Sequence, residues 1–246
     1  MRVLSTPSKT VPSREHVAEM FDHIAHRYDL LNRLLSFGRD IAWRKRFLRG
    51  LPERPGLRVL DLATGTGDVL LTLAADPRVA SGAGLDMSAG MLRYAAAKLA
   101  ARGLDERFPL IRGDAARLAL QSSIFDVITI SFGIRNVAQV EDALREMLRV
   151  LRPGGRAMIM EFSIPANRIF RPVYLFYLRH VLPRLGSFLS GDANAYRYLN
   201  QTVESFPYGC NFCKLMARAG FAHIECVTLS LGIATLYLGR KGDAIS

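Results

Sequence analysis

Cysteine, tryptophan and long apolar runs are all scarce in this sequence. Its three cysteines include one pair at metal or redox spacing, Cys210 and Cys213, but no second pair completes a metal site. We therefore expect no bound metal and interpret the thiols as packing residues in a reducing compartment. No apolar run approaches the roughly 18 residues that span a bilayer. The Ser- and Pro-rich start of the chain carries no hydrophobic segment either, so we expect a cytoplasmic protein without a signal peptide.

Acidic residues are outnumbered by basic ones. The chain has 33 Lys and Arg against 22 Asp and Glu, which gives a formal net charge of +11. Such a surplus favours nucleic acid, anionic lipid or acidic substrates as partners. The basic residues are spread along the chain instead of forming a dense block, and no RNA-binding signature accompanies them. We therefore expect no nucleic-acid partner, and the bland alternative is a solvated basic surface.

The stretch that organises the chain is LRVLDLATGTGD, from Leu57 to Asp68. A short apolar run ends at Asp61, a Gly-rich turn follows, and a helical pattern begins after the turn. This order predicts the first strand–turn–helix unit of a doubly wound α/β sheet. Gly65 and Gly67 permit positive φ and close approach of a ligand. In such sheets the ligand lies past the carboxyl ends of the strands, where Asp61 and both glycines stand.

The acids around this turn separate the ligand classes. The turn begins like the dinucleotide fingerprint G-x-G-x-x-G, but its fourth and sixth positions are Asp68 and Leu70. Asp68 would repel a pyrophosphate at the helix N-terminus, which disfavours a nicotinamide oxidoreductase. S-adenosylmethionine carries positive charge and no phosphate. Asp86 ends a second apolar run about 20 residues on, where an acid accepts hydrogen bonds from ribose hydroxyls. We therefore predict S-adenosylmethionine as the cofactor; the alternative is a loop that binds no nucleotide.

The order of the remaining elements predicts one domain over residues 14–246, after a disordered tail over 1–13. Strands are expected at 59–62, 83–86, 108–112, 126–131 and 156–162, and helices at 41–51, 68–75, 88–102 and 140–151, the last stopped by Pro153-Gly154-Gly155. This alternation predicts a parallel cofactor-binding core over 57–162. Residues 14–52 are interpreted as a helical lid over the ligand crevice.

After the core, the pattern predicts a helical insertion over 165–206 and a C-terminal helix and strand hairpin over 207–246. A parallel sheet closed by such a hairpin is the class I S-adenosylmethionine-dependent methyltransferase architecture: α/β and Rossmann-like, with a seven-stranded sheet. An RNA or protein modifier of this fold would need an acceptor motif such as Asn/Asp-Pro-Pro-Tyr after the fourth strand. The chain has Ser131-Phe132-Gly133-Ile134 there instead.

Several longer motifs resemble one family over nearly the whole chain. They are Arg27-Tyr28-Asp29 with Asn32, Ser36-Phe37-Gly38, Asp61 to Asp68, Thr129 to Val137, Glu161-Phe162-Ser163, and Ala195-Tyr196 with Tyr198-Leu199. In these motifs the chain resembles the C-methyltransferases of menaquinone and ubiquinone biosynthesis. The resemblance implies C-methylation of a polyprenylated quinol by S-adenosylmethionine, with demethylmenaquinol to menaquinol as the first candidate. The alternatives are C-methylation of 2-methoxy-6-polyprenyl-1,4-benzoquinol in ubiquinone biosynthesis and a non-catalytic scaffold of the quinone pathway.

The resemblance also implies which residues bind the cofactor and the quinol. The expected cofactor-binding residues are Asp61, Gly65, Thr66, Gly67, Asp86, Met87, Asp114, Ala115 and Ser131. The expected substrate-binding residues are Tyr28, Phe132 and Tyr196. The aromatic, leucine-rich segment 171–189 suits a polyprenyl tail, and its arginines suit anionic lipid heads. We therefore expect a peripheral membrane contact; the rival is a homodimer interface built from the same residues.

The expected catalytic residues are Arg135 and Asn136. Arg135 would stabilise the phenolate that makes a ring carbon nucleophilic, and Asn136 would orient the ring oxygen or a water. An Arg side chain stays protonated, so a water held by Arg135 is expected to relay the proton. His23 and His26 are weaker candidates for the base. The alternative is that Arg135 pairs with an acid such as Asp86 or Asp114 and only braces the loop.

Overall fold

The computed structural model describes residues 19–22, 25, 29, 32–33, 36, 38–184 and 193–243; in helix α10 it describes side chains from residue 198 onward. Several sequence predictions therefore lie outside the described residues. These are the tail over 1–13, the histidines at 23 and 26, Tyr28, and the side chain of Tyr196.

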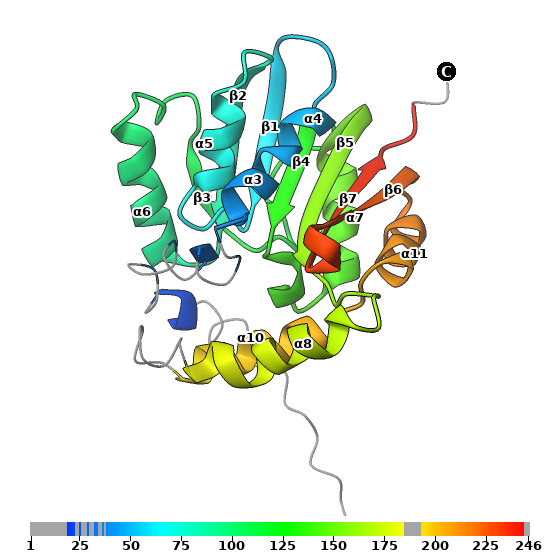
Figure 1. Ribbon diagram of the computed structural model, residues 1–246. Helices are drawn as coiled ribbons and strands as arrows, with labels where there is room; N and C mark the ends of the chain where they lie inside the picture. The colour runs from blue at the N-terminus through cyan, green and yellow to red at the C-terminus, as the bar shows by residue number, and fades with distance from the viewer. Residues whose placement is uncertain are drawn as a thin grey trace, which may run out of the picture.

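A seven-stranded sheet in the order β3-β2-β1-β4-β5-β7-β6 forms the centre of the molecule (Figure 1). The strands are β1 Leu57–Leu62, β2 Val79–Asp86, β3 Leu110–Arg112, β4 Phe125–Ser131, β5 Leu151–Phe162, β6 Ala222–Leu229 and β7 Ala234–Arg240. Strands β1 to β5 are parallel, whereas β7 is antiparallel to both β5 and β6. The predicted parallel core closed by an antiparallel hairpin is confirmed.

Helices cover both faces of this sheet (Figure 1). The longer ones are α5 Asp68–Ala74, α6 Ala89–Ala100, α7 Val140–Val150, α8 Phe170–Phe176, α10 Ala193–Ser205 and α11 Cys210–Ala219. The short ones are α3 Asp40–Arg44, α4 Arg46–Gly50, η2 Ile134–Asn136, η3 Tyr177–Val181 and η4 Ser230–Gly232. Within the described residues, no helix is both long and apolar enough to cross a membrane.

Alternation along the central strands divides the core into two layers. Val59 and Val127 belong to a cluster that includes residues of α3, α4 and α5. Leu60 and Ile128, one position further on in each strand, belong to a second cluster with residues of α7 and α11. Successive strand residues point to opposite faces, so strands buried on both sides read as continuous apolar runs.

Several predicted bounds differ from the structure. The helix over 140–151 ends within one residue of its predicted end, at Val150, but Pro153-Gly154-Gly155 does not stop it, because β5 begins at Leu151, which pairs with Phe125 of β4. The strand predicted over 83–86 likewise begins earlier, at Val79. The Pro-Gly-Gly run lies inside β5, where the β4–β5 register shifts and Gly154 adopts φ 72°. The predicted helix over 41–51 is also two short helices, α3 and α4. Pro and Gly disrupt regular pairing in a strand as well as in a helix, so their presence did not identify which element they interrupt.

Candidate functional site

A cavity opens at the carboxyl ends of β1, β2 and β4. The space not filled by atoms, including its part open to solvent, is about 750 Å³. Its lining residues are Phe21, Ala63, Gly65, Leu85, Asp86, Met87, Ser88, Met91, Gly113, Asp114, Ala115, Ser131, Phe132, Gly133, Asn136, Val137 and Ala138. The only charged side chains in this described lining are the carboxylates of Asp86 and Asp114. The cavity is therefore acidic in a basic protein and suits a cationic ligand without phosphate.

Asp86 connects the Gly-rich turn to the start of α6. Its carboxylate oxygens accept hydrogen bonds from the Gly65 amide at 2.8 Å and the Ser88 amide at 2.9 Å. Burial raises the pKa of the Asp86 carboxyl above its ordinary value, although these amide bonds oppose the shift. Ser88, the first residue of the helix predicted over 88–102, is the N-cap of α6, and its Oγ accepts from the Met91 amide at 3.0 Å.

The two glycines of the turn have different surroundings. Gly65 lines the cavity, whereas Gly67 adopts φ 81° at the N-cap of α5. A Cβ on Gly67 would lie 3.2 Å from the Ala95 Cβ. Gly67 therefore allows the start of α5 to approach α6. This packing and the positive φ explain a glycine at this position without a contact to a ligand.

Asp61 lies beneath the turn and is not among the described cavity residues. Its carboxylate accepts hydrogen bonds from the hydroxyls of Thr64 and Thr129, each at 2.6 Å. Complete burial raises the pKa of Asp61 to about 7, and the nearby Asp86 charge acts in the same direction. Asp61 thus braces the ends of β1 and β4 below the cavity.

The raised pKa of Asp61 predicts a pH-dependent stability. The folded protein binds this proton more tightly than the unfolded chain, so the contribution of Asp61 to stability falls as pH rises from about 4 to about 7. The difference in free energy of unfolding between Asp61→Asn and the native chain should therefore shift in favour of the variant between about pH 5 and pH 8. Urea unfolding at both pH values measures it. A difference that is constant with pH would contradict a raised pKa.

The described residues of the N-terminal segment lie against the cavity. Phe21 lines it, and the Asp22 carboxylate accepts hydrogen bonds from the Ser88 hydroxyl and from the Gly90 amide at 2.7 Å. These contacts place Asp22 at the start of α6. The opening and closing of a lid stays a prediction.

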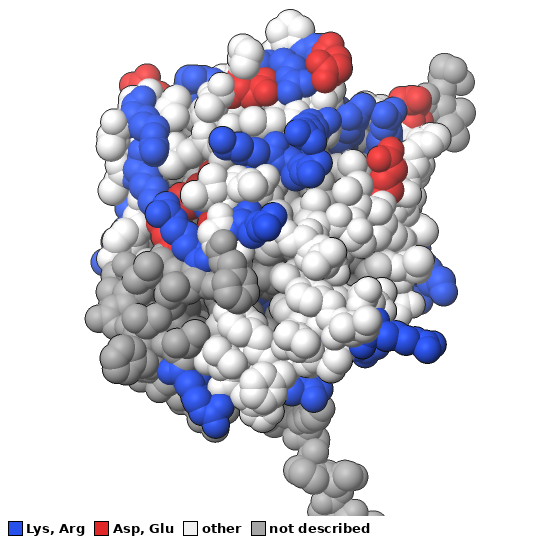
Figure 2. Space-filling view, viewed as in Figure 1, with Lys and Arg blue, Asp and Glu red and all other residues white. Residues whose placement is uncertain are grey.

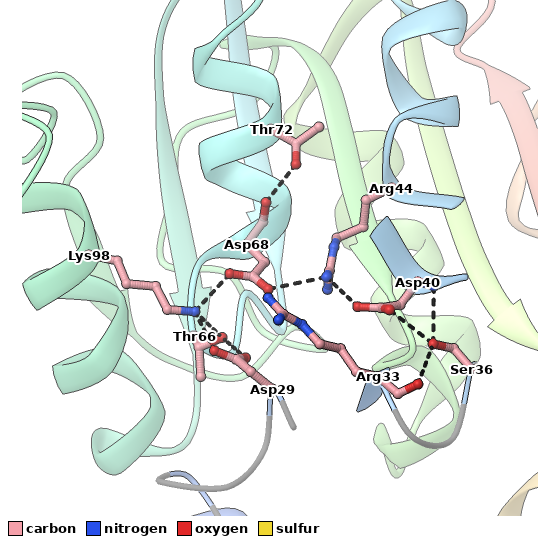
Figure 3. Close-up of polar contacts among 9 residues, drawn as sticks. All are labelled: Asp29, Arg33, Ser36, Asp40, Arg44, Thr66, Asp68, Thr72 and Lys98. Carbon is pink, nitrogen blue, oxygen red and sulfur yellow. Dashed lines mark hydrogen bonds and ion pairs between the residues drawn. The ribbon is translucent and has the colours of Figure 1, made fainter. Parts of the chain in front are cut away.

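A second polar network lies beside the turn (Figure 3). The Lys98 ammonium contacts Asp29 at 2.6 Å, Asp68 at 2.7 Å and the Thr66 hydroxyl at 3.0 Å. The Thr66 hydroxyl donates to Asp29 at 2.6 Å, and Arg44 contacts Asp68 at 3.2 Å. Sequence reasoning used the Asp68 charge to choose the ligand of the cavity. In the structure this carboxylate faces two cations and Thr66 faces Asp29, so neither side chain lines the cavity.

At the opposite end of the cavity, η2 presents Arg135 and Asn136. The Arg135 guanidinium donates to the Glu161 carboxylate and to the Phe132 carbonyl, both at 2.6 Å, and lies 5.3 Å from the Phe162 ring centroid. The side chains of Arg135 and Glu161 are only 7% and 1% exposed. Arg135 therefore pairs with an acid, as the alternative expected, but the acid is Glu161 and not Asp86 or Asp114.

Unpaired polar atoms remain in this buried corner. Within the described residues, Arg135 Nε and Asn136 Oδ1 are buried without a hydrogen-bond partner. An unpaired buried donor or acceptor costs free energy, and functional sites are where such atoms persist. A donor and an acceptor on adjacent residues suit a ligand hydroxyl, which both accepts and donates.

Backbone strain shapes this corner. Phe132 adopts φ 57°, an uncommon conformation for an aromatic residue, and its ring centroid lies 4.3 Å from that of Phe162. A Cβ on the next residue, Gly133, would lie 2.4 Å from the Ala63 Cβ. Only glycine fits there, because the ends of β1 and β4 approach so closely.

Tyr174 and Tyr198 lie within electrostatic range of Arg135 and Glu161, and burial raises the pKa of both tyrosines.

Sequence reasoning located much of the cavity. The predicted site residues that line it are Gly65, Asp86, Met87, Asp114, Ala115, Ser131, Phe132 and Asn136. The predicted residues absent from the described lining are Asp61, Thr66, Gly67 and Arg135. Ala63 and Ser88 were missed although they adjoin predicted motifs. Phe21 falls within the predicted lid over 14–52, but sequence periodicity indicates the apolar face of a helix without naming what that face covers.

None of the three cysteines belongs to the described lining of the cavity. In the part of the chain that the structure describes, no group of three His, Cys, Asp or Glu side chains is placed to hold a metal ion. All three cysteines are free. Burial raises the pKa of the Cys213 thiol and raises that of Cys226 to about 11, so both favour the neutral thiol.

Comparisons with known sequences agree along nearly the whole chain. A family model described as the ubiE/COQ5 methyltransferase family matches residues 9–241. The ubiquinone/menaquinone biosynthesis C-methyltransferase UbiE of Syntrophotalea carbinolica is 47% identical over 222 residues, 90% of this chain and 92% of that protein. The demethylmenaquinone methyltransferase of Thermus thermophilus is 46% identical over 222 residues, 90% of this chain and 100% of that protein.

Solved structures share the fold at lower identity. A SAM-dependent methyltransferase from Thermotoga maritima matches with a TM-score of 0.63 and 17% identity, covering 92% of this chain and 100% of that chain. Phosphoethanolamine N-methyltransferase 2 of Haemonchus contortus, in complex with S-adenosyl-L-methionine, matches with a TM-score of 0.68 and 14% identity, covering 97% of this chain and 62% of that chain. At such identities the likeness shows the class I methyltransferase fold alone.

Proposed function

The chain belongs to the ubiE/COQ5 methyltransferase family, and from this premise we propose that it methylates a ring carbon of a polyprenylated quinol in quinone biosynthesis, using S-adenosylmethionine. The observation that carries the proposal is the acidic cavity. It has Asp86 and Asp114 as its only charges in the described lining, and the unpartnered Oδ1 of Asn136 at its other end. We propose demethylmenaquinol as the substrate, with a methoxy-polyprenyl-benzoquinol as the alternative.

The cavity residues fit this cofactor by their chemistry. Asp86 would accept hydrogen bonds from the ribose hydroxyls, and Asp114 would accept one from the adenine amino group. Phe21, Met87 and Met91 provide apolar surface for a planar base. Both carboxylates favour the positively charged sulfonium and amino groups, and no cation in the described lining opposes them. When bound, the cofactor supplies an electrophilic methyl group.

The corner at Arg135 fits a quinol ring. Asn136 Oδ1 accepts the hydrogen bond of a ring hydroxyl, and Arg135 Nε donates to the oxygen as negative charge builds on it. The hydroxyl proton would pass to water as charge builds on the oxygen. The ring carbon beside that oxygen would bond to the methyl carbon while the methyl–sulfur bond breaks and leaves S-adenosylhomocysteine. When this carbon loses its own proton and the ring regains aromaticity, the oxygen takes a proton back, so one proton is released overall. Glu161 fixes the guanidinium so that its unpaired Nε stays available. The protein thus positions both reactants and stabilises a phenolate.

Methyl transfer to two quinols tests this assignment. Methyl-labelled S-adenosylmethionine is supplied with reduced demethylmenaquinone, or with 2-methoxy-6-polyprenyl-1,4-benzoquinol of the same tail length. The expected result is a labelled ring carbon in the naphthoquinol. Labelling of the benzoquinol alone would assign the ubiquinone pathway. Labelling of neither quinol by a chain that binds S-adenosylhomocysteine would refute the substrate.

Helix α8 supports a membrane contact for delivery of a prenylated substrate. Ile169, Val173 and Phe176 recur at helical spacing and are 82%, 60% and 61% exposed. Figure 2 shows a largely uncharged surface over α8, with basic side chains at its margins. Exposed apolar residues beside arginines are typical of helices that lie in the surface of anionic bilayers. We therefore propose that α8 contacts the membrane; the rival remains a homodimer built on the same residues.

Substitution on α8 separates these two partners. Val173→Ser with Phe176→Ser should abolish co-sedimentation with anionic vesicles at low salt, because the variant loses the apolar area that enters the bilayer. Turnover of a short-tailed quinol in solution should persist. Val227→Ser on β6, also exposed, is the control. Unchanged vesicle binding would refute the membrane contact, and a native dimer that the double variant dissociates would favour the rival.

A further inference from the structure

We propose that Lys98 is a positioning residue: it fastens the N-terminal segment along α6 and thereby holds Phe21 over the cofactor cavity. The inference deepens the proposed function and rests on it for the identity of the cofactor. Lys98 itself lies outside the described lining of the cavity. It acts through Asp29, and through the contact that the segment makes with the ligand.

The contacts of Lys98 join three parts of the chain (Figure 3). Lys98 lies in the last turn of α6, and its ammonium contacts Asp29 of the N-terminal segment at 2.6 Å. It also contacts Thr66 and Asp68 of the Gly-rich turn, at 3.0 Å and 2.7 Å. Because the Thr66 hydroxyl donates to Asp29 at 2.6 Å, the turn and the segment are joined directly as well. These bonds are charge-assisted, which makes them stronger than neutral hydrogen bonds.

Two anchors, at Asp22 and at Asp29, hold described residues of the N-terminal segment against the two ends of one helix. At the N-terminus of α6, the Asp22 carboxylate accepts from the Ser88 hydroxyl and the Gly90 amide. At the other end of α6, Lys98 holds Asp29. Phe21 lies beside the first anchor and lines the cavity, as Met91 of α6 also does. The anchors therefore fix residues 22 and 29 against the helix that forms one wall of the cofactor site.

The positive charge of Lys98 is what keeps Asp29 close to Asp68. The one ammonium of Lys98 contacts two carboxylates, and the side chains of Lys98, Asp29 and Asp68 are only 28%, 35% and 24% exposed. Arg44 shares Asp68 with Lys98 but is also committed to Asp40. Loss of the Lys98 charge leaves Asp29 facing Asp68 with their common cation removed, and their repulsion pushes the segment away from the turn. Such a loss costs more than breaking one exposed ion pair.

Cofactor binding to matched variants tests this role. Lys98→Met should weaken the binding of S-adenosylhomocysteine about tenfold; it should raise KM for S-adenosylmethionine while kcat at saturation changes little. Lys98→Arg should restore most of the affinity, because it keeps the charge. Lys214→Met, exposed on α11, is the control and should bind as the native chain does.

A double-mutant cycle with Asp29→Asn identifies the contact. Asp29→Asn should weaken binding by itself, and adding Lys98→Met should weaken it no further, because both changes remove the same anchor. The cycle also covers instability of the Lys98→Met protein, since Asp29→Asn breaks the same contact while Lys98 stays in place. The native affinity should fall with added salt, whereas that of the Lys98→Met protein should respond less.

The outcomes distinguish this inference from the proposed function. Native binding with unchanged affinity in both Lys98→Met and Asp29→Asn would overturn the anchoring role and leave the cofactor assignment intact. Additive losses in the double variant would also overturn it, because independent effects are not a shared contact. A native chain that binds no S-adenosylhomocysteine would refute the proposed function itself.

Discussion

Arg135→Met is expected to lower kcat at least 100-fold while leaving the dissociation constant for S-adenosylhomocysteine unchanged. Removal of one preorganised donor that faces a developing oxyanion costs about 10²–10³ in kcat. Arg135 carries the unpaired Nε at the corner where the quinol oxygen is proposed to lie, and it lies outside the described lining of the cavity. The loss should therefore appear in turnover and not in cofactor affinity.

Because Glu161 is the buried partner of Arg135, the Arg135→Met experiment needs a control variant that also removes the charge of Glu161. Met at position 135 leaves Glu161 as an uncompensated buried charge, which is destabilising in its own right. The double variant Arg135→Met with Glu161→Gln removes that charge and should recover thermal stability without recovering turnover. Arg145→Met on the exposed face of α7 is the matched control. Turnover in the folded double variant within a few-fold of native would contradict the role of Arg135.

Asp86→Asn is expected to weaken S-adenosylhomocysteine binding by about 100-fold, because hydrogen bonds to a charged acceptor contribute more than those to a neutral one. The substitution also weakens the hydrogen bonds that the Gly65 and Ser88 amides donate to the Asp86 carboxylate, and these bonds hold the turn in shape. Asp114→Asn should cost much less, because a neutral amide oxygen still accepts from an amino group. Isothermal titration of both variants measures the difference, and a loss within twofold for Asp86→Asn would contradict the assignment.

Binding should also depend on pH through Asp86. Burial raises the pKa of this carboxyl, and the form that accepts two ribose hydroxyls is the anion. Protonation therefore begins at a higher pH than for an ordinary Asp, and affinity should fall as pH decreases through that range. The native chain should lose affinity on acidification, whereas Asp86→Asn should show a flatter profile. Affinity that rises on acidification would contradict a role for the Asp86 anion in binding.

The sequence was sufficient for features that depend on local chemistry. Gly65 and Asp86 could be placed at the cavity because glycine spacing identifies the turn and parallel strands bring their carboxyl ends to one edge. The Ser88 cap followed from its position before a helical pattern. The fold class followed from the alternation of strands and helices and from the final hairpin.

Long-range pairing could not be predicted. The motif supplied Asp68, but its cations Lys98 and Arg44 lie 30 residues after and 24 residues before it in the chain, and nothing local pairs them. Glu161 was noticed as part of a motif, yet its partnership with Arg135 depends on β4 and β5 being neighbours in register. Charge alone does not indicate whether an acid faces a ligand or another side chain. Side-chain direction at the turn was therefore the least predictable part of the site.

A crystal structure with S-adenosylhomocysteine tests the central claim most directly. The account predicts the ligand in the acidic cavity, with its ribose hydroxyls within hydrogen-bond distance of the Asp86 carboxylate and its adenine amino group on Asp114. Its sulfur should face the corner formed by Asn136 and Phe132. A ligand bound elsewhere on the chain, or bound in this cavity with its ribose away from Asp86, would contradict the account.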